Sequence, residues 1–414
     1  MNGNSDAFEF AQLQDLYRQG QYAASHAGLR VLCSKYAGAP WTEFTVQLFF
    51  CYETAASSLG LPNPYAARLH DCVHHVDRLL QPGAKDQAYL FYALSLLRAK
   101  RYADAYPYLK YIQPVRAPNI APDNMGFFRP GDAGKTLLVY MSGGIGDRIM
   151  YARFVFAACR RYPENRVLFL ADDSLCWIFR DALQGFGNVR VIPYSERYAL
   201  PAYDYHCNVI ALMAYLEITY GGESDVAPEY YLRSLSLSLS KINTVMDGII
   251  LPGQLNVVVN WHGNYENAQE KFNRGMPLTA LAPLLSGFPK GVRWISVQKE
   301  VSAEERKILR AHGVADLSYL VDRDGDSYRD TLWILKNADL VITTDTSLAH
   351  IAGTACVNCW TLLTAGCDWR WTQQDKSTAW YPRMKLVRQR RANDWSSVVN
   401  TLTKAVAKIV ETRK

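Results

Sequence analysis

The spacing of apolar residues is helical over the first part of the chain. Apolar side chains recur at intervals of three and four residues within 8–17 and again within 27–32, which is the period of one face of an α-helix. The run around Tyr22 is echoed by the run around Tyr102, 80 residues later (102 − 22). That separation corresponds to about two periods of a helix-pair repeat. The pattern predicts an all-helical domain over residues 1–118, either a repeat array or a helical cap that buries its own core.

The pattern changes after a linker at 115–133 that is rich in Pro, Asn and Gly. From there, short apolar runs alternate with helical patterns, which is typical of parallel sheets with crossover helices. The predicted strands are Thr136–Met141, Arg166–Leu170, Val189–Ile192, Tyr205–Val209, Asn256–Asn260, Arg293–Val297, Leu340–Thr343, Cys359–Leu363 and Lys385–Val387. The segment 222–253 breaks the alternation, so we predict two α/β domains, 134–250 and 251–392. A helix within 393–414 follows them.

Composition narrows the class of protein. Hydrophobic residues are 49% and charged residues 20%, a balance that excludes a disordered or fibrous chain. The formal net charge of +6 (45 basic minus 39 acidic residues) suits anionic ligands but is too small to indicate nucleic-acid binding. No apolar run is long enough to predict an integral membrane segment, and Met1–Phe10 does not resemble a signal peptide. We therefore expect a cytoplasmic protein whose nine cysteines are reduced, mostly buried thiols.

The first candidate for chemistry is a glycine-rich turn after the strand at 136–141. Gly143, Gly144 and Gly146 let the backbone turn tightly and let a ligand approach closely, and a helix follows. The turn is not G-x-G-x-x-G, so a dinucleotide cofactor is not indicated. Asp147 lies where the turn enters the helix. It is either a first-turn acid stabilised by the helix dipole or a general base at the mouth of a cleft.

The second candidate is the segment Asp339–Gly353. An apolar strand ends in Asp345, Thr346 and Ser347, which open a short helix. Hydroxyls and backbone N–H groups at a helix start form a site for a phosphate. His350 lies one turn inside this helix and is either a ligand-binding group or a hydrogen-bonded core histidine.

Together and in this order, these motifs resemble the GT-B glycosyltransferases related to bacterial heptosyltransferases (glycosyltransferase family 9), in particular those with tetratricopeptide repeats at the N-terminus. The likeness covers roughly residues 134–392. It is carried by Gly143-Gly144-Ile145-Gly146-Asp147 with Tyr151-Ala152-Arg153-Phe154, by Asn260-Trp261-His262-Gly263-Asn264 with Arg274-Gly275-Met276-Pro277-Leu278, and by Asp345 to Gly353 with Cys367-Asp368-Trp369-Arg370-Trp371, Trp380-Tyr381-Pro382 and Arg388-Gln389.

The resemblance implies a GT-B fold, in which two Rossmann-like domains face a cleft, preceded by the helical domain. The first α/β domain would hold the acceptor and the second the nucleotide-sugar donor. Asp147 is similar to the catalytic base, and Gly143, Gly144, Gly146 and Arg148 would lie at the acceptor side of the cleft. The donor-binding residues that the resemblance implies are Asn264, Arg274, Gln298, Asp345, Thr346, Ser347 and His350, with Lys299 beside Gln298. Trp261 and Trp369 are candidates for stacking on a sugar or base.

The chain departs from the family's pattern at Gly275, at Cys356–Cys359 and at Cys367, which puts local geometry and donor choice in doubt. Cys356, Cys359 and Cys367 with His350 have metal-like spacing, but they lack a second Cys-x2-Cys pair, so we expect no metal. Asp322–Asp326 contains a D-x-D pattern and is expected to be a solvated acidic turn.

From these features we expect an inverting, metal-independent glycosyltransferase with no cofactor beyond its nucleotide-sugar substrate. The acceptor is a glycan or a protein, which the helical repeats would recruit. The rival reading is a non-catalytic scaffold in which the repeats bind a partner and the GT-B body is degenerate. The basic segment 383–414 leaves open a peripheral contact with the inner membrane. The sugar, the nucleotide and the oligomeric state are not encoded in any motif found here.

Overall fold

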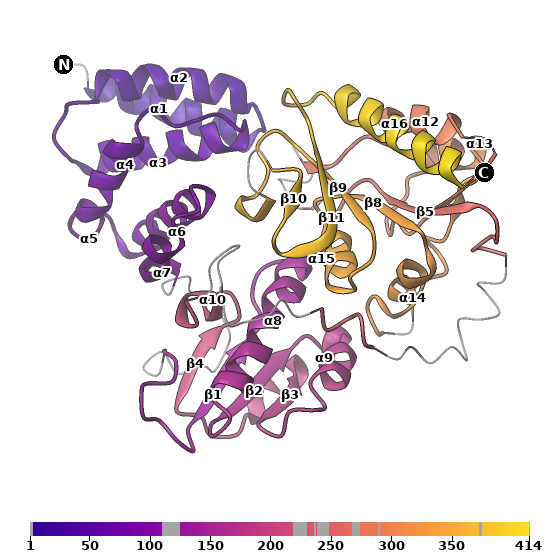
Figure 1. Ribbon diagram of the computed structural model, residues 1–414. Coiled ribbons are helices and arrows are strands. Elements are labelled where there is room, and N and C mark those ends of the chain that lie inside the picture. Colours follow the sequence, from indigo (N-terminus) through magenta and orange to yellow (C-terminus); the bar gives the residue numbers. More distant parts are fainter. Residues whose placement is uncertain are drawn as a thin grey trace.

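The structure is a computed structural model that describes residues 3–109, 125–217, 230–235, 237, 248–266, 274–288, 290–323, 325–371 and 375–413. It has three parts: a helical region, a four-stranded α/β part and a seven-stranded α/β part (Figure 1). Part of the predicted linker, and most of the segment predicted to separate the two α/β domains, lie outside the described residues.

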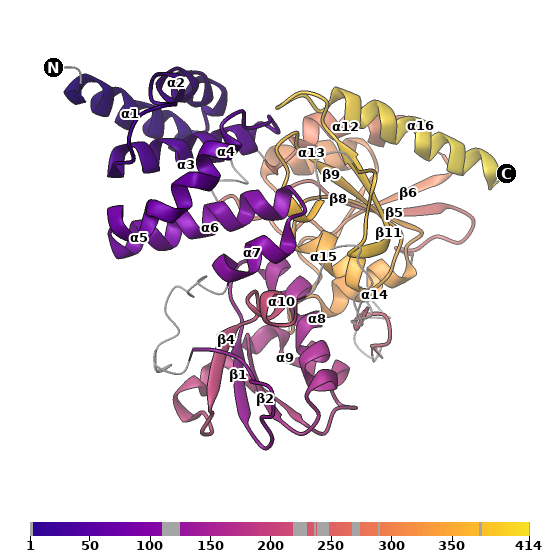
Figure 2. The ribbon, with the colours of Figure 1, turned by 60° about the vertical axis from the view of Figure 1, so that its left-hand side comes forward.

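The helical region is a series of hairpins. Its helices are α1 (Gly3–Arg18), α2 (Tyr22–Lys35), α3 (Glu43–Ser58), α4 (Ala66–Cys72), α5 (Val76–Leu79), α6 (Pro82–Arg98) and α7 (Tyr102–Leu109), with a 3-10 turn η1 (Val73–His75) before α5. Figure 2 shows α1 to α7 arranged one below another along one side of the molecule.

Three turns in this region share one hydrogen-bonding pattern. After α1, the Gln21 N–H donates to the Leu16 carbonyl, and the N–H of Gly20 donates to the carbonyl of Tyr17, both at 2.9 Å. The same two bonds recur in the turns after α3 and α6, and this paired arrangement is the Schellman ending of a helix. The residue with positive φ in each is Gly20 (78°), Gly60 (68°) and Lys100 (59°).

These residues are 40 apart in both steps (60 − 20 and 100 − 60). The region therefore holds three copies of a 40-residue helical hairpin, whereas the sequence pattern indicated only the first and third. The middle copy lacks the tyrosine that marks the other two, because Pro62 stands at that position.

The first α/β part has a parallel sheet in the order β3-β2-β1-β4. Its strands are β1 (Thr136–Tyr140), β2 (Arg166–Ala171), β3 (Val189–Pro193) and β4 (Tyr205–Asn208). Its helices are α8 (Ile145–Arg161), α9 (Cys176–Ala182) and α10 (Leu212–Tyr215), with 3-10 turns η3 (Asp173–Leu175) and η4 (Tyr194–Ala199). Three of the five β1 residues are fully buried because the strand is central.

The second α/β part has a sheet in the order β10-β11-β9-β8-β5-β6-β7, parallel except for the pair β10 and β11. Its strands are β5 (Leu255–Asn260), β6 (Val292–Ser296), β7 (Ala315–Asp316), β8 (Leu340–Thr344), β9 (Cys359–Leu363), β10 (Ser377–Thr378) and β11 (Tyr381–Arg388). Its helices are α12 (Leu278–Ser286), α13 (Ala303–Ala311), α14 (Arg329–Asn337), α15 (Ser347–Thr354) and α16 (Ser396–Thr412), with a 3-10 turn η6 (Trp369–Trp371).

The predicted fold class is confirmed: two parallel-sheet α/β parts follow an all-helical region. All nine predicted strands are present with shifts of a few residues at their ends. The two strands that the sequence did not reveal, β7 and β10, have two residues each, which is too short for an alternating pattern to be seen.

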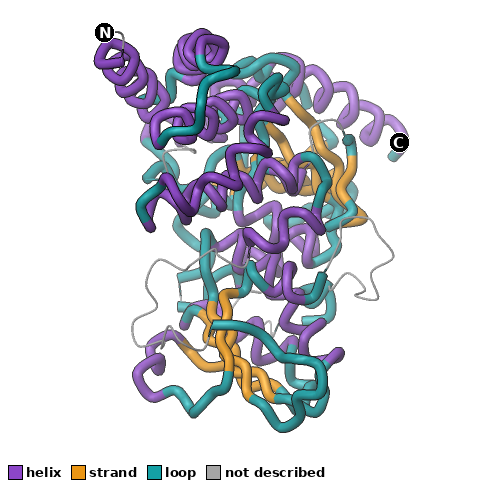
Figure 3. Tube along the Cα trace, turned by 90° about the vertical axis from the view of Figure 1, so that its left-hand side faces the viewer, coloured by secondary structure: helices purple, strands orange, loops and turns teal. Residues whose placement is uncertain are grey.

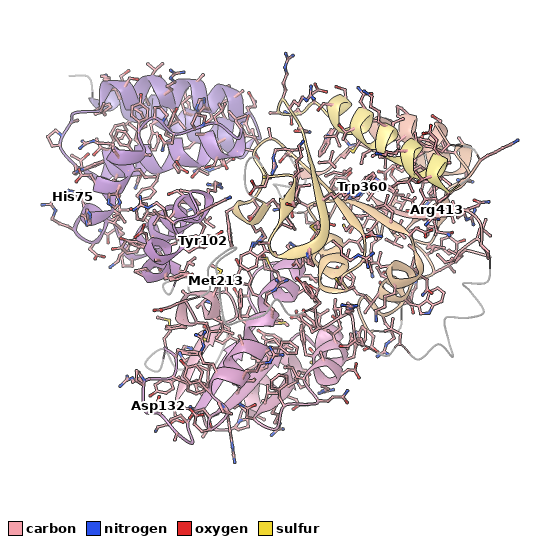
Figure 4. The ribbon with its side chains drawn as sticks, viewed as in Figure 1. His75, Tyr102, Asp132, Met213, Trp360 and Arg413 are labelled. Carbon is pink, nitrogen blue, oxygen red and sulfur yellow. The ribbon has the colours of Figure 1, made fainter. Side chains whose placement is uncertain are left out.

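The parts are packed together by close backbone approaches. A Cβ on Gly60 would lie 2.3 Å from the carbonyl oxygen of Ala365, and one on Gly366 would lie 2.2 Å from that of Ser58, so glycines join the helical region to the second α/β part. Seen from the helical side, the repeats cover the second sheet, with the first sheet below (Figure 3). Tyr102 of α7 lies near Met213 of α10, where the helices meet the first α/β part (Figure 4).

Candidate active site

A cavity of about 1080 Å³ lies between the two α/β parts, and the helical region closes one side of it. The ends of β1 and β8 lead into it, so it occupies the carboxyl edge of both sheets, where open α/β sheets bind their ligands. The lining residues are Leu90, Leu94, Leu97 and Leu109 from the helices; 140–148, Tyr151, Leu170, Asp172, Tyr194 and Ile210 from the first α/β part; and Gly263, Asn264, Arg274, 345–347, His350 and 368–370 from the second.

One wall is the glycine turn between β1 and α8. Gly143 has a φ of 80°, and Gly144 is the residue that caps α8. Asp147 lies in the first turn of α8, and its Oδ2 accepts a hydrogen bond of 2.9 Å from the N–H of Gly144. The first-turn role that the sequence suggested for this acid is therefore present, and the same side chain also lines the cavity.

A buried arginine joins Asp147 to the second α/β part. Arg370, in η6, donates from Nη2 to Oδ1 of Asp147 at 2.5 Å, and its Nη1 lies 3.3 Å from Oδ1 of Asp368. Burial opposes the charged form of Arg370, but the carboxylates of Asp368 and Asp147 outweigh it and hold its pKa well above the ordinary value. From the sequence, Arg370 and Asp368 belong to a stretch that resembles the family, but neither was predicted to have a role in the site.

Arg148 shapes the turn rather than reaching across the cavity. Its Nε donates to the carbonyl of Gly143 at 3.0 Å, and its Nη1 pairs with Oδ2 of Asp172 at 2.5 Å. Asp172, which directly follows β2, is thus the carboxylate partner of Arg148.

The start of α15 lines the cavity next to the glycine turn. Thr346 caps the helix by accepting from the N–H of Leu348 at 3.3 Å. Its hydroxyl also lies 3.1 Å from Oδ1 of Asn260, which accepts from Thr343 as well. Ser347 lies 2.6 Å, oxygen to oxygen, from the hydroxyl of Tyr328. These contacts fix the turn and direct the N-terminus of an eight-residue helix toward the cavity.

Asp345 and Arg274 form a second charged pair beside this helix. Their closest approach is 3.6 Å, between Nε of Arg274 and Oδ2 of Asp345. Burial raises the pKa of Asp345 because it disfavours the charged carboxylate, whereas the charge of Arg274 acts in the opposite direction. Arg274 keeps 27% of its side chain exposed, and both residues line the cavity.

His350 is a buried, neutral histidine. Burial lowers its pKa well below the ordinary value, and the charges of Arg370, Arg153 and Arg274 lower it further. Its Nδ1 lies 2.8 Å from the hydroxyl of Tyr381. The imidazole stacks on Trp371 with ring centres 5.2 Å apart.

The ring of His350 also packs against the glycine turn. A Cβ on Gly146 would lie 2.7 Å from its Cδ2, so a glycine is needed where α8 meets α15. His350 is thus a buried, hydrogen-bonded core histidine that also lines the cavity, and its role in ligand binding stays a prediction.

Three of the predicted site residues, Trp261, Gln298 and Lys299, do not line the cavity. Trp261 is fully buried in the core between the second sheet and α12, and its Nε1 donates to Glu305 at 2.6 Å, so its predicted stacking role is corrected. Gln298 is also buried, and its Oε1 accepts from Nδ2 of Asn260 at 2.7 Å. Gln298 therefore stabilises the end of β5 without lining the cavity. Lys299 pairs with Asp322 at 3.2 Å. Trp369 lines the cavity, as does Asn264.

The structure also describes the two weaker motifs of the sequence, the cysteine cluster and the acidic turn. In the part of the chain that the structure describes, no group of three or more His, Cys, Asp or Glu residues is arranged to hold a metal ion. Burial raises the pKa of Cys359 and of Cys367 to about 12. Asp322 accepts from the N–H of Asp330 at 2.9 Å and from the hydroxyl of Thr331 at 2.6 Å, so it caps α14. Its side chain is fully buried, so the expectation of a solvated acidic turn is wrong for this residue. Among the described helices, none is long and apolar enough to cross a membrane.

No protein-family model matches the chain, and no curated protein matches it. Among solved structures, it is similar to a glycosyl transferase of family 9 from Veillonella parvula DSM 2008 (9% identity, TM-score 0.45, 68% of this chain and 98% of that one). It is also similar to E. coli ADP-heptose lps heptosyltransferase II (13%, 0.42, 67% and 100%) and to an O-GlcNAc transferase mutant from Thermobaculum terrenum (12%, 0.33, 96% and 84%). At this degree of similarity, the matches assign no function to this chain.

Proposed function

We propose that the protein is a glycosyltransferase that moves a sugar from a nucleotide-sugar donor to an acceptor hydroxyl. The observation that carries the proposal is the combination of two kinds of group in one cavity. Asp147 lines it from the first α/β part, and Arg274 with the N-terminus of α15 lines it from the second. A carboxylate in the same cavity as an anion-binding helix start is the arrangement needed for base-assisted displacement of a nucleoside diphosphate.

The donor side would hold the diphosphate. Free N–H groups at the start of α15 favour an anion. Arg274 keeps 27% of its side chain exposed and adds a positive charge to the same wall of the cavity. Ser347 adds a hydroxyl beside these groups. These groups would stabilise the charge that develops on the departing diphosphate, so the reaction as proposed is metal-independent.

His350 would assist by a hydrogen bond rather than by charge. A neutral imidazole carries one N–H donor. When the hydroxyl of Tyr381 donates to Nδ1, the proton is on Nε2. This nitrogen is on the side of the ring that packs against Gly146 and the cavity. His350 would therefore orient a donor oxygen.

The reaction is a single displacement with inversion. The acceptor oxygen bonds to the anomeric carbon while the bond from that carbon to the diphosphate oxygen breaks. The acceptor proton passes to Asp147, and the electron pair leaves with the nucleoside diphosphate. General-base assistance of this kind contributes typically about 10²–10⁴-fold in rate.

The acceptor, a saccharide or a polypeptide, would enter beside the helical region. Leu90, Leu94 and Leu97 of α6 and Leu109 of α7 form the wall there. The helices thus take part in the cavity itself, and recruitment of an acceptor by the repeats is part of the proposal.

A thermal-shift screen of UDP, GDP, ADP, CMP and their sugar derivatives tests this function. We expect at least one nucleoside diphosphate or its sugar to raise the melting temperature, with or without EDTA. Stabilisation that requires a divalent cation would refute the metal-independent mechanism. The absence of stabilisation by every nucleotide would favour the non-catalytic scaffold.

A further inference from the structure

Two of the arginines that line the cavity, Arg274 and Arg370, have different surroundings. Arg274 has 27% of its side chain exposed, whereas Arg370 has 10%. Both come from the second α/β part. This difference decides which of them can meet an incoming anion.

The guanidinium of Arg370 is occupied by carboxylates. One terminal nitrogen contacts Asp147 at 2.5 Å and the other contacts Asp368 at 3.3 Å. Its Nε is buried and has no hydrogen-bond partner among the described residues, so it does not face the cavity either. The planar group lies near the rings of Tyr151 and Trp369, 5.7 and 5.6 Å from their centres.

The charge around Arg370 does not favour a phosphate. Two carboxylates and one guanidinium give this cluster a formal charge of −1 (1 − 2). A diphosphate at Arg370 would have to displace a carboxylate or lie beside two of them. Arg274 lies farther from its carboxylate neighbour Asp345, with 3.6 Å between Nε of Arg274 and Oδ2 of Asp345.

We propose that Arg370 is a positioning residue that acts through Asp147 and does not bind the donor, which leaves the donor phosphates to Arg274. This inference rests on the proposed function, in which Asp147 is the base. Rigid support matters here because, among the residues that the structure describes, Asp147 has one further hydrogen-bond partner, the N–H of Gly144. A misplacement of about 1 Å in a reacting group can cost about 10²-fold in rate.

The contact also links two segments that are far apart in the sequence. Asp147 belongs to α8 and Arg370 to η6, 223 residues later. The orientation of the Asp147 carboxylate therefore depends on the packing of the two α/β parts against each other.

The test compares Arg370→Met with Arg274→Met, each measured for nucleotide affinity and for turnover. We expect Arg370→Met to lower kcat by about 10²-fold with nucleotide affinity within about twofold of the unaltered protein. We expect Arg274→Met to weaken nucleotide binding at least about tenfold, since it removes a charge-assisted contact. Equal losses of nucleotide affinity in the two variants would overturn the inference while leaving the proposed function intact.

A double variant separates positioning from a general structural role. If Arg370 acts through Asp147, Asp147→Asn/Arg370→Met should turn over no more slowly than Asp147→Asn alone. A further loss of tenfold or more in the double variant would overturn the inference. Arg370→Lys keeps the positive charge and should restore part of the lost kcat. This variant is the control in case Arg370→Met folds poorly. If no nucleotide binds the unaltered protein, the proposed function and this inference both fail.

Discussion

Replacing Gly143 by alanine tests whether the glycine turn holds Asp147 in place. A Cβ at this position would lie 2.7 Å from Oδ2 and 2.9 Å from Cβ of Asp147, and the backbone has a φ of 80°. Gly131 is a matched control because its φ is 87° and a Cβ there would meet nothing within 4 Å. The two variants thus share the backbone strain and differ in the clash with Asp147.

The strain of a non-glycine residue in the left-handed region is about 1–2 kcal/mol. The lower entropy of the unfolded alanine chain offsets about 0.4–1 kcal/mol of it. Gly131→Ala should therefore cost about 1 kcal/mol. Gly143→Ala must also displace the carboxylate of Asp147 from the N–H of Gly144, a bond to a charged group worth about 1.5–3 kcal/mol. The expected total is about 2.5–4 kcal/mol.

Urea unfolding followed by circular dichroism measures the difference between the variants, and turnover of a donor identified by the nucleotide screen measures its effect on the site. We expect Gly143→Ala to lose at least about tenfold in kcat, since the carboxylate is misplaced, and Gly131→Ala to keep the activity of the unaltered protein. Equal destabilisation by the two substitutions, with equal activity, would show that Gly143 does not position Asp147.

Three further predictions follow from the same geometry. Asp147→Asn should keep nucleotide affinity and lose at least about 10²-fold in turnover, and full activity in this variant would remove Asp147 from the base role. Gly60→Ala should loosen the helical region and speed its proteolysis, because the new Cβ would meet the backbone of residue 365. Gly313→Ala is the control, since Gly313 has a φ of 65° and open space around its Cβ position, and it should not change the rate of proteolysis. Equal proteolysis of the two variants would argue against the contact between Gly60 and residue 365. Because burial lowers the pKa of His350 from its ordinary 6.5, the unfolded chain binds a proton below about pH 6.5 that the folded chain does not, so stability should fall as the pH drops from there. The urea midpoint should vary less with pH in His350→Gln, and an unchanged variation would contradict the assignment.

Features that depend on neighbours in the chain were predictable from the sequence. The strands, the glycine turn before Asp147 and the capped helix at Thr346 are each set by a few consecutive residues, and the structure has all of them. The repeat of the helical hairpin was only partly visible. Its middle turn is identical in hydrogen bonding, but Pro62 replaces the tyrosine that marks the other copies.

Contacts between distant segments were not predictable in the same way. Arg370 meets Asp147 only because α8 and η6 lie on opposite sides of one cavity. Trp261 follows a strand directly and stands beside cavity residues in sequence, yet its side chain packs toward α12 and Glu305. The direction of such a side chain is decided by the packing of the core, which a single sequence does not display.

Hydrogen–deuterium exchange tests the central claim most directly, since it locates a bound nucleotide on the full chain. The nucleoside diphosphate that most stabilises the protein would be added at saturating concentration, with Arg274→Met as the control. We predict slower exchange in the segments 343–354 and 143–150, both of which contribute residues to the cavity, and little change in Arg274→Met. Protection confined to other segments, or none in the unaltered protein, would contradict the assignment of this cavity to a nucleotide-sugar donor.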